Sequence, residues 1–342
     1  MIRFKSKHLY QIPAFTVLLA CTLFSCKQSP PPASSGSQPE DTASTYVPSF
    51  NADSAYDYIA KQVAFGPRVP GTKANLACAV YLETTLRSHM PDVMVQKAVV
   101  RAYDNTLLNI RNIIGMFHPE RSDRILLCAH WDTRHIADHD PDPDMRKNPI
   151  LGANDGGSGT GVLLEIARQL ALDDPGIGVD IVLFDAEDYG QPEDALPQKE
   201  DTWCLGSQYW SKNPHKPGYK ARFGILLDMV GAKNATFPKE EYSVYYAPGI
   251  VSMVWETASR LGYGAFFPDR LGGAVTDDHY YVNTILRIPT INIIHQDMSG
   301  AKPFFEHWHT VKDNMESIDP LTLEAVGNTV LMVLHQQKKK TL

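Results

Sequence analysis

The spacing of hydrophobic residues predicts two kinds of segment in the first third of the chain. Apolar residues recur every three or four positions in 54–63 and in 75–90, which is typical of helices that bury one face. Apolar and polar residues alternate in 93–100 and in 107–117, as in strands with one buried face. We therefore expect two helices followed by two strands, which are close enough in the sequence to pair antiparallel.

Beyond residue 120 the pattern changes to short, unbroken apolar runs separated by segments with helical spacing. Strands that are covered on both faces have continuous apolar runs, because neither face meets water. The expected buried strands are Ile125–Ala129, Val179–Phe184, Phe223–Leu227 and Thr290–Ile294. The expected helices are Gly159–Leu172, Ile250–Leu261 and Ser317–Gln336. The chain is therefore predicted to be an α/β three-layer sandwich, with a mixed, mostly parallel central sheet flanked by helices.

The first 45 residues follow neither pattern. Basic residues among the first seven precede an apolar run, Ile12–Phe24, which is about as long as the hydrophobic region of a signal peptide and too short to span a membrane comfortably. The run is followed by Ser25-Cys26, and a small residue before a cysteine resembles a bacterial lipobox, in which the cysteine is acylated. Residues 27–45 are rich in proline, serine and glutamine without a hydrophobic period, as in a disordered tether.

These features divide the chain into three parts. We expect residues 1–25 to be a signal peptide, residues 26–45 a tether anchored to lipid at Cys26, and residues 46–342 a single folded domain. Such a protein would face the periplasm in a bacterial cell envelope. Phe24 is bulkier than the usual residue at its position in a lipobox, so a plain signal peptide that releases the domain into the periplasm is the alternative.

Composition narrows the classes of partner. The chain has 342 residues, 43% of them hydrophobic, and a formal net charge of −7. This length suffices for one large domain, and the acidic balance argues against nucleic acid, which would require a basic surface. Cys78, Cys128 and Cys204 fall in the predicted domain. Their odd number leaves at least one free, while export would permit one disulfide.

Polar residues cluster where the predicted buried strands end. Those that follow the strands, or lie in the glycine-rich loop Leu151–Gly161, are His130, Asp155, Glu187, Asp188 and Asp228. In open α/β sheets, ligands bind outside the carboxyl ends of the strands. Glycines let the backbone of the loop approach a ligand closely. We therefore expect these side chains to share one rim, which His309 can join from a late loop.

This set of side chains favours a zinc site. Histidine and carboxylate from separate strand ends are the mixed ligands of catalytic zinc sites, which leave one position open. Asp185 precedes the rim and is expected to be structural. The segment with His135, His139 and the acidic run 138–144 is expected to be a solvated loop, because it lacks the spacing of a calcium loop.

Four motifs in order resemble those of the M28 zinc aminopeptidase superfamily. They are His130–Thr133, Gly152–Gly156, Glu187-Asp188 and Trp308–Thr310. The resemblance extends from about Phe50 to the end of the chain. It implies one of two chemistries: the superfamily contains two-zinc aminopeptidases, and it also contains animal-type glutaminyl cyclases, which share the fold but use one zinc.

Three features favour the cyclases. The stretch Leu227–Pro238 is similar to the cyclase sequence around its second catalytic acid, including the final Thr-Phe-Pro. Asp277-Asp278-His279 resembles the cyclase motif, where peptidases usually have Ser-Asp-His. Phe304 with Trp308 matches the aromatic wall of the cyclases beside their zinc histidine. One feature departs from the family: the acidic pair is Glu187-Asp188, not Glu-Glu, so the implied zinc carboxylate is one methylene shorter.

The resemblance implies a reaction and a role for each residue. The reaction converts the N-terminal glutamine of a peptide or protein into pyroglutamate and releases ammonia, with zinc as Lewis acid. The implied ligands of one zinc per chain are Asp155, Asp188 and His309. The implied catalytic acids are Glu187, which shuttles the proton, and Asp228 and Asp277, which orient the amine. The implied substrate-binding residues are Trp308 and Phe304, with Trp203 as the nearest candidate for a further tryptophan.

Two alternatives stay open at this point. A two-zinc aminopeptidase would use His130 and Asp228 as further ligands, with Asp155 between the metals. A non-enzymatic, lipid-anchored binding module would keep the same shell of residues without catalysis. Under the cyclase hypothesis, we expect His130 to lie near Asp155 without holding a metal.

Overall fold

The computed structural model describes residues 49–297 and 304–338. The predicted signal peptide and tether, residues 1–45, lie outside this part of the chain and stay predictions. None of the helices in the described ranges is both long and apolar enough to cross a membrane.

Six strands form one mixed sheet in the order β1-β2-β4-β3-β5-β6. Their bounds are β1 Asp92–Arg101, β2 Leu107–Phe117, β3 Arg124–His130, β4 Gly178–Phe184, β5 Gly224–Asp228 and β6 Thr290–Ile294. The pair β1–β2 is antiparallel, as predicted, and so is β2–β4. The pairs β3–β4, β3–β5 and β5–β6 are parallel. The predicted mixed, mostly parallel sheet is confirmed, and each predicted buried strand ends within one residue of its observed bounds.

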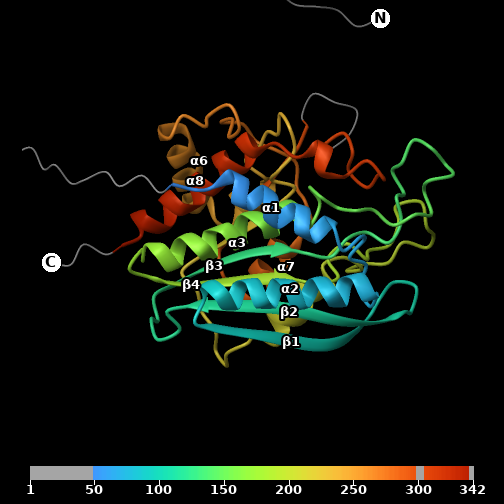
Figure 1. Ribbon diagram of the computed structural model, residues 1–342, viewed down its shortest axis with the longest axis horizontal. Helices are drawn as coiled ribbons and strands as arrows, with labels where there is room; N and C mark the ends of the chain where they lie inside the picture. Colours follow the sequence, from blue (N-terminus) through green and yellow to red (C-terminus); the bar gives the residue numbers. More distant parts are fainter. Residues whose placement is uncertain (1–48, 298–303, 339–342) are drawn as a thin grey trace, which may run out of the picture. The chain divides into compact units, whose positions relative to one another are not determined.

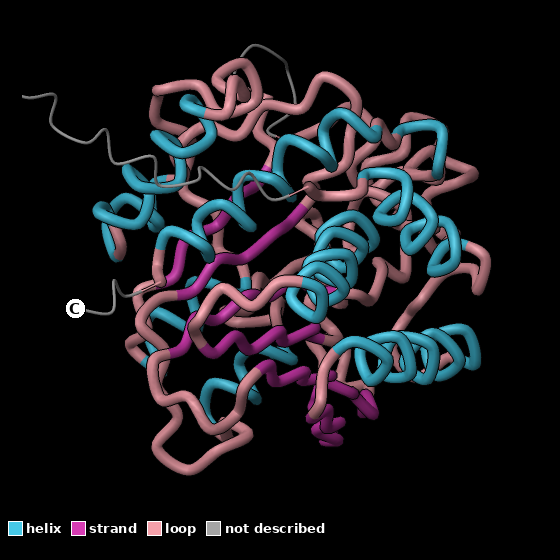
Figure 2. Tube along the Cα trace, turned by 60° about the vertical axis from the view of Figure 1, so that its left-hand side comes forward, coloured by secondary structure: helices cyan, strands magenta, loops and turns pink. Residues whose placement is uncertain are grey.

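Helices cover both faces of this sheet, which confirms the three layers (Figure 2). One face carries α1 Ala52–Val63, α2 Lys73–His89, α3 Gly157–Leu172, α6 Pro248–Arg260 and α8 Pro320–Gln336. The other carries α4 Leu205–Lys212, α7 Asp278–Tyr281 and the π-helical turn Val282–Leu286. The remaining elements are α5 Glu241–Tyr246, beside β6, and the 3-10 turn Met315–Ser317. Figure 1 shows α2 lying across β1 and β2, and α1 beside α3.

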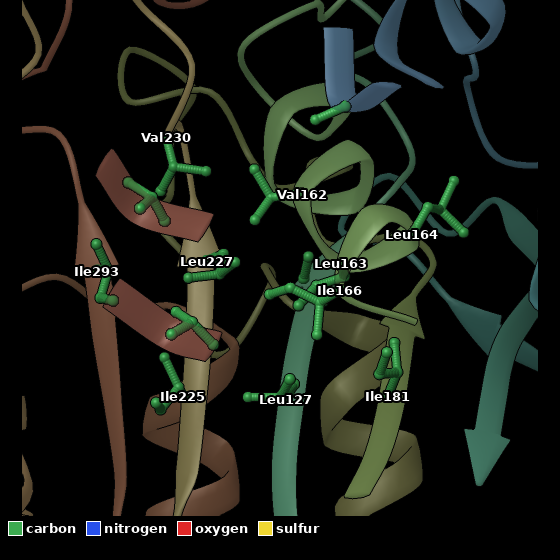
Figure 3. Packing of buried hydrophobic residues seen from close by; sticks show 14 of the residues in the cluster. Leu127, Val162, Leu163, Leu164, Ile166, Ile181, Ile225, Leu227, Val230 and Ile293 are labelled. Atoms are coloured by element: carbon green, nitrogen blue, oxygen red, sulfur yellow. The ribbon is translucent and has the colours of Figure 1, made fainter. Parts of the chain in front are cut away.

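The strands divide their side chains between two cores. Because successive residues of a strand point to opposite faces, Leu127 packs in the larger core beneath α3, while its neighbours Leu126 and Cys128 pack in the smaller core against α4. Figure 3 shows Val162 and Ile166 of α3 directed toward the strands. Full burial of such a side chain contributes about 1.5–3 kcal/mol to stability. The unbroken apolar runs of the sequence are therefore the signature of strands buried on both sides.

The N-terminal end of α3 lies unusually close to β5. A Cβ atom at Gly159 would stand 2.1 Å from the carbonyl oxygen of Leu227, so only glycine permits this approach. The Ser158 hydroxyl accepts a hydrogen bond from the Val230 amide at 2.9 Å, and the Asn154 side chain accepts one from Gly231 at 2.8 Å. The glycine-rich loop is thereby fixed beside the carboxyl end of β5.

The short helices were not predicted, and one long helix begins later than predicted. α8 begins at Pro320 and not at Ser317, because Asp319 caps the helix through the Leu321 amide. α4, α5 and α7 have eight, six and four residues, too few for a hydrophobic period to be recognised. Cys78, Cys128 and Cys204 are all buried and free, so the disulfide that export would permit is not formed.

Candidate active site

The residues predicted for metal, substrate and catalysis meet at one cavity of about 230 Å³. It lies at the carboxyl ends of the parallel strands, where the sequence placed the rim. The nine predicted residues that line it are Asp155, Glu187, Asp188, Trp203, Asp228, Asp277, Phe304, Trp308 and His309. His130 lies beside the cavity, in contact with Asp155.

Three of these residues face one another as metal ligands do. Nε2 of His309 lies 3.2 Å from Oδ1 of Asp188 and 3.6 Å from Oδ2 of Asp155. All three side chains are buried, and among the described residues Oδ2 of Asp155 and both carboxylate oxygens of Asp188 accept no hydrogen bond. Buried carboxylate oxygens without hydrogen bonds are costly unless cations compensate them, and the Arg134 guanidinium, 3.8 Å from Oδ1 of Asp188, does so only in part. One nitrogen and two carboxylates also match the ligands of catalytic zinc, so the residues fit this metal.

Two further buried carboxylates hold the ligand-bearing loops in place. Asp313 accepts hydrogen bonds from the amides of Asn154 at 2.8 Å and Asp155 at 3.0 Å. Asp132 accepts hydrogen bonds from the amides of Glu187 at 3.0 Å and Asp188 at 3.1 Å. Asp132 belongs to the His-Trp-Asp motif, but Asp313 gave no signal in the sequence.

His130 belongs to a second group of possible ligands. Its Nε2 lies 3.2 Å from Oδ1 of Asp155 and 3.1 Å from Oδ1 of Asp228, so it lies beside Asp155 as expected. Burial acts to lower the pKa of His130, but the neighbouring carboxylates of Asp132, Asp155 and Asp228 raise it well above the usual value. Asp155 thus stands between two groups of three, the arrangement that the two-zinc alternative requires.

The acids on the other side of the cavity are protonated more readily than ordinary carboxyls. Burial raises the pKa of Glu187 well above its usual range, with a further contribution from Asp277 that opposes the attraction of His130. Burial likewise raises the pKa of Asp228 to about 7. One carboxylate oxygen of Asp277 accepts a hydrogen bond from Asn292 of β6 at 2.6 Å. Burial therefore favours the protonated form of these neighbouring acids, which suits them to proton transfer.

Aromatic rings enclose this group. Trp308 stacks on the ring of His309 with centroids 3.9 Å apart, and Phe304 packs against Trp308 at 4.7 Å. Trp203 lies nearly parallel to His309, with centroids 5.9 Å apart. The guanidinium carbon of Arg134 lies 4.4 Å from the centre of the Trp203 ring. Trp203, the weakest candidate in the sequence, therefore forms part of the cavity wall.

The prediction of a solvated acidic loop was wrong for its first half. Asp138 and Asp140 fold back against the loop of His309, and only residues 141–149 are exposed. Oδ1 of Asp138 lies 3.3 Å from Nδ1 of His309, within ion-pair distance but without the geometry of a hydrogen bond. Asp140 accepts a hydrogen bond from the Val311 amide at 3.0 Å. These contacts join segments far apart in the sequence, which no local pattern records.

Asp185 has the structural environment that was predicted for it. Its carboxylate accepts hydrogen bonds from the Arg111 amide at 2.7 Å and from the Asn75 side chain at 3.1 Å. Both partners lie away from the cavity, on β2 and α2.

Known proteins with similar sequences and structures carry the same fold. Residues 112–334 match peptidase family M28. A glutaminyl cyclase from Tannerella forsythia is 56% identical, with a TM-score of 0.84 over 85% of this chain and 100% of that chain. A Zn-dependent exopeptidase from Parabacteroides distasonis gives the same identity, TM-score and coverage. The glutaminyl-peptide cyclotransferase of Bos taurus is 25% identical over 303 residues, which are 78% of this chain and 77% of the bovine protein. The chain therefore belongs to peptidase family M28.

Proposed function

We propose that the protein is a glutaminyl-peptide cyclotransferase, which converts the N-terminal glutamine of peptides and proteins into pyroglutamate and releases ammonia. The observation that carries this proposal is a third acid, Asp277, in the same cavity as Glu187 and Asp228, enclosed by aromatic rings beside His309. The cavity of about 230 Å³ is smaller than the 300–1,000 Å³ typical of ligand pockets, and so suits a single side chain.

Asp155, Asp188 and His309 would hold one zinc ion per chain. When bound there, zinc would supply a Lewis acid for the γ-carbonyl oxygen of the substrate glutamine. Asp188 takes the place of a longer glutamate in the family pattern, and its carboxylate is nevertheless 3.2 Å from Nε2 of His309. The shorter side chain therefore reaches the same group of ligands.

The three acids would divide the work on the substrate amine. In the reaction, the α-amine nitrogen forms a bond to the γ-carbon, the bond from that carbon to the amide nitrogen breaks, and ammonia leaves. One proton must pass from the attacking amine to the leaving nitrogen. Glu187, with its raised pKa, is suited to accept and return this proton, and such transfer contributes about 10²–10⁴-fold to the rate. Asp228 and Asp277 would orient the amine.

The aromatic walls would hold the substrate in a folded conformation. Cyclisation brings the amine and the carboxamide of one residue together, which is largely a matter of positioning. Phe304, Trp308 and Trp203 give the cavity apolar sides close to the ring of His309. These sides would also exclude water. Water is the nucleophile in hydrolysis, whereas in cyclisation it would only compete with the amine.

The second candidate is a two-zinc aminopeptidase, which removes N-terminal residues. The group formed by His130, Asp155 and Asp228 favours it, and similar proteins include ones described as a Zn-dependent exopeptidase and as a leucine aminopeptidase precursor. The aminopeptidase mechanism gives Asp277 no role, whereas cyclisation needs an acid that positions the amine. A binding module without catalysis is disfavoured, because a similar glutaminyl cyclase is 56% identical over its whole length.

The experiment that tests the proposal is incubation of the purified protein with a peptide that begins with glutamine. We expect the peptide to lose the mass of one ammonia, and elemental analysis to give one zinc per chain. Release of the first residue, together with two tightly held zinc ions, would establish the peptidase.

The cellular placement is a separate proposal, supported by the sequence pattern alone. Residues 1–25 would direct export, and acylation of Cys26 would anchor the domain through residues 26–45 on the periplasmic side of the envelope. Labelling cells with a radioactive fatty acid tests it. The wild-type protein should carry the label and Cys26→Ala should not; an unlabelled wild-type protein in the periplasm would favour the plain signal peptide.

A further inference from the structure

Cys204 contacts Glu187 and has no role in the metal, catalytic or substrate-binding groups described above. Its Sγ is 3.2 Å from Oε1 of Glu187, and the side chain is fully buried. Two backbone hydrogen bonds join the same segments: the amide of Cys204 donates to the carbonyl of Glu187, and the amide of Leu205 to that of Ala186, each at 2.9 Å. The thiol is thus held against the carboxylate by the backbone on both sides.

The conformation of Cys204 is unusual for its position. It occupies the N-cap of α4, where serine, threonine, aspartate or asparagine usually accepts a hydrogen bond from the helix. The Cys204 side chain makes no capping hydrogen bond, and its φ of 58° is left-handed. Such a conformation costs about 1–3 kcal/mol for a residue other than glycine, and persists where the surroundings enforce it.

The thiol is a donor toward Glu187. Burial raises the pKa of Cys204 well above its usual value, and the nearby charge of Glu187 adds to this effect, so the sulfur keeps its proton. Among the described residues, this is the single hydrogen bond that the Glu187 carboxylate accepts. The bond engages Oε1, while Oε2 accepts no hydrogen bond in the described residues and lies 3.9 Å from Nδ1 of His130. Asp277 lies in the same group, but its oxygens are engaged by the Asp278 amide and Asn292.

We infer that Cys204 is a positioning residue for the cyclisation: its thiol holds the Glu187 carboxylate so that one oxygen is fixed and the other is presented to the substrate. This inference rests on the proposed function and refines it. Without the thiol, the Glu187 side chain would rotate more freely. A smaller fraction of the molecules would then hold Glu187 in the orientation in which a proton passes from the amine to the leaving nitrogen.

The test compares three substitutions of Cys204 in the full chain with a matched control. Cys204→Ala removes the donor, and Cys204→Ser replaces it with a hydroxyl. Cys204→Gly removes the donor and also relieves the positive φ, so it supplies the measurement if the alanine variant does not fold. Cys78→Ala, at a buried cysteine of α2, is the control for the same loss of volume. Each variant is assayed for kcat and KM with a peptide that begins with glutamine, for zinc content and for melting temperature.

We expect kcat to fall roughly tenfold in Cys204→Ala and Cys204→Gly, with KM and zinc content unchanged. This loss is smaller than the whole contribution of proton transfer, about 10²–10⁴-fold, because Glu187 itself is still present. Cys204→Ser should have a kcat within about threefold of the wild-type value, and Cys78→Ala should have the wild-type kcat. Equal kcat in the alanine, glycine and control variants would overturn the inference. Loss of zinc in step with activity, without rescue by serine, would overturn it in favour of a structural role. A wild-type protein that does not cyclise the peptide would overturn the proposed function itself.

Discussion

Asp138 offers a sharp test of how the metal ligands are oriented. Its carboxylate lies 3.3 Å from Nδ1 of His309, on the side of the ring away from Asp155 and Asp188. It is itself held by Arg134, whose Nε donates a hydrogen bond to it at 2.7 Å. Burial acts to raise the pKa of Asp138, but Arg134 and His309 outweigh this and hold the pKa well below its usual value. Asp138 is therefore charged, and it lies within range of Nδ1, the ring nitrogen that would remain free if Nε2 held zinc.

Asp138→Asn removes this charge with almost no change in shape. Loss of a carboxylate that orients a histidine ligand typically weakens metal binding about 10–100-fold, equivalent to about 1.4–2.7 kcal/mol. The zinc dissociation constant is measured by competition with a chromophoric chelator. The matched control is Asp142→Asn, in the exposed half of the same loop. If both variants bind zinc as the wild type does, the orienting role of Asp138 is refuted. A melting temperature for each variant separates this effect from the loss of a partner for Arg134.

Three further predictions concern catalysis, packing and pH. Asp277→Asn should lower kcat at least tenfold while zinc content stays at the wild-type value, because Asp277 lines the cavity outside the proposed ligand group; zinc loss would contradict this. Gly159→Ala should destabilise the protein by about 3 kcal/mol or more in urea unfolding, since its Cβ would meet a β5 carbonyl at 2.1 Å. Gly249→Ala, where nothing lies within 4 Å, is the control and should change stability by less than about 1 kcal/mol. Burial acts to raise the pKa of Glu240, but the hydrogen bond with His279 and those from backbone amides lower it to about 2. Because its folded pKa is depressed, Glu240 should contribute about 3 kcal/mol above about pH 4.5, and lose this as the pH falls toward 2. The gap in unfolding free energy between the wild type and Glu240→Gln should therefore narrow on acidification, and a constant gap would refute the assignment.

Several elements could be predicted because their signals are local. Leu127 and its neighbours form an unbroken apolar run, which is a direct consequence of burial on both faces of a strand. Polar residues at the ends of such runs meet at one edge, since parallel strands point the same way. His130, Glu187 and Asp228 were placed together on that argument, and they line or adjoin one cavity.

Other contacts had no signal in the chain. Asp313 and Asp155 are 158 positions apart, yet the amide of Asp155 donates a hydrogen bond to the Asp313 carboxylate. Asp138 was predicted to belong to a solvated loop. The composition of this acidic segment is the same whether its side chains face water or the ring of His309. Short helices such as α4, which begins after Cys204, end before a hydrophobic period can be established.

The sequence by itself determined the layers, the positions of the buried strands along the chain, and the resemblance of the glycine-rich loop around Asp155 to the M28 motif. Each of these depends on periodicity or on a short motif, and both are properties of neighbouring residues. Only the tertiary structure decided which side chains support the reacting groups: Asp138 against His309, Asp313 beneath Asp155, and Cys204 against Glu187. The physical reason is that a hydrogen bond or ion pair depends on distance in space, and the sequence specifies that distance only through the packing of the whole domain.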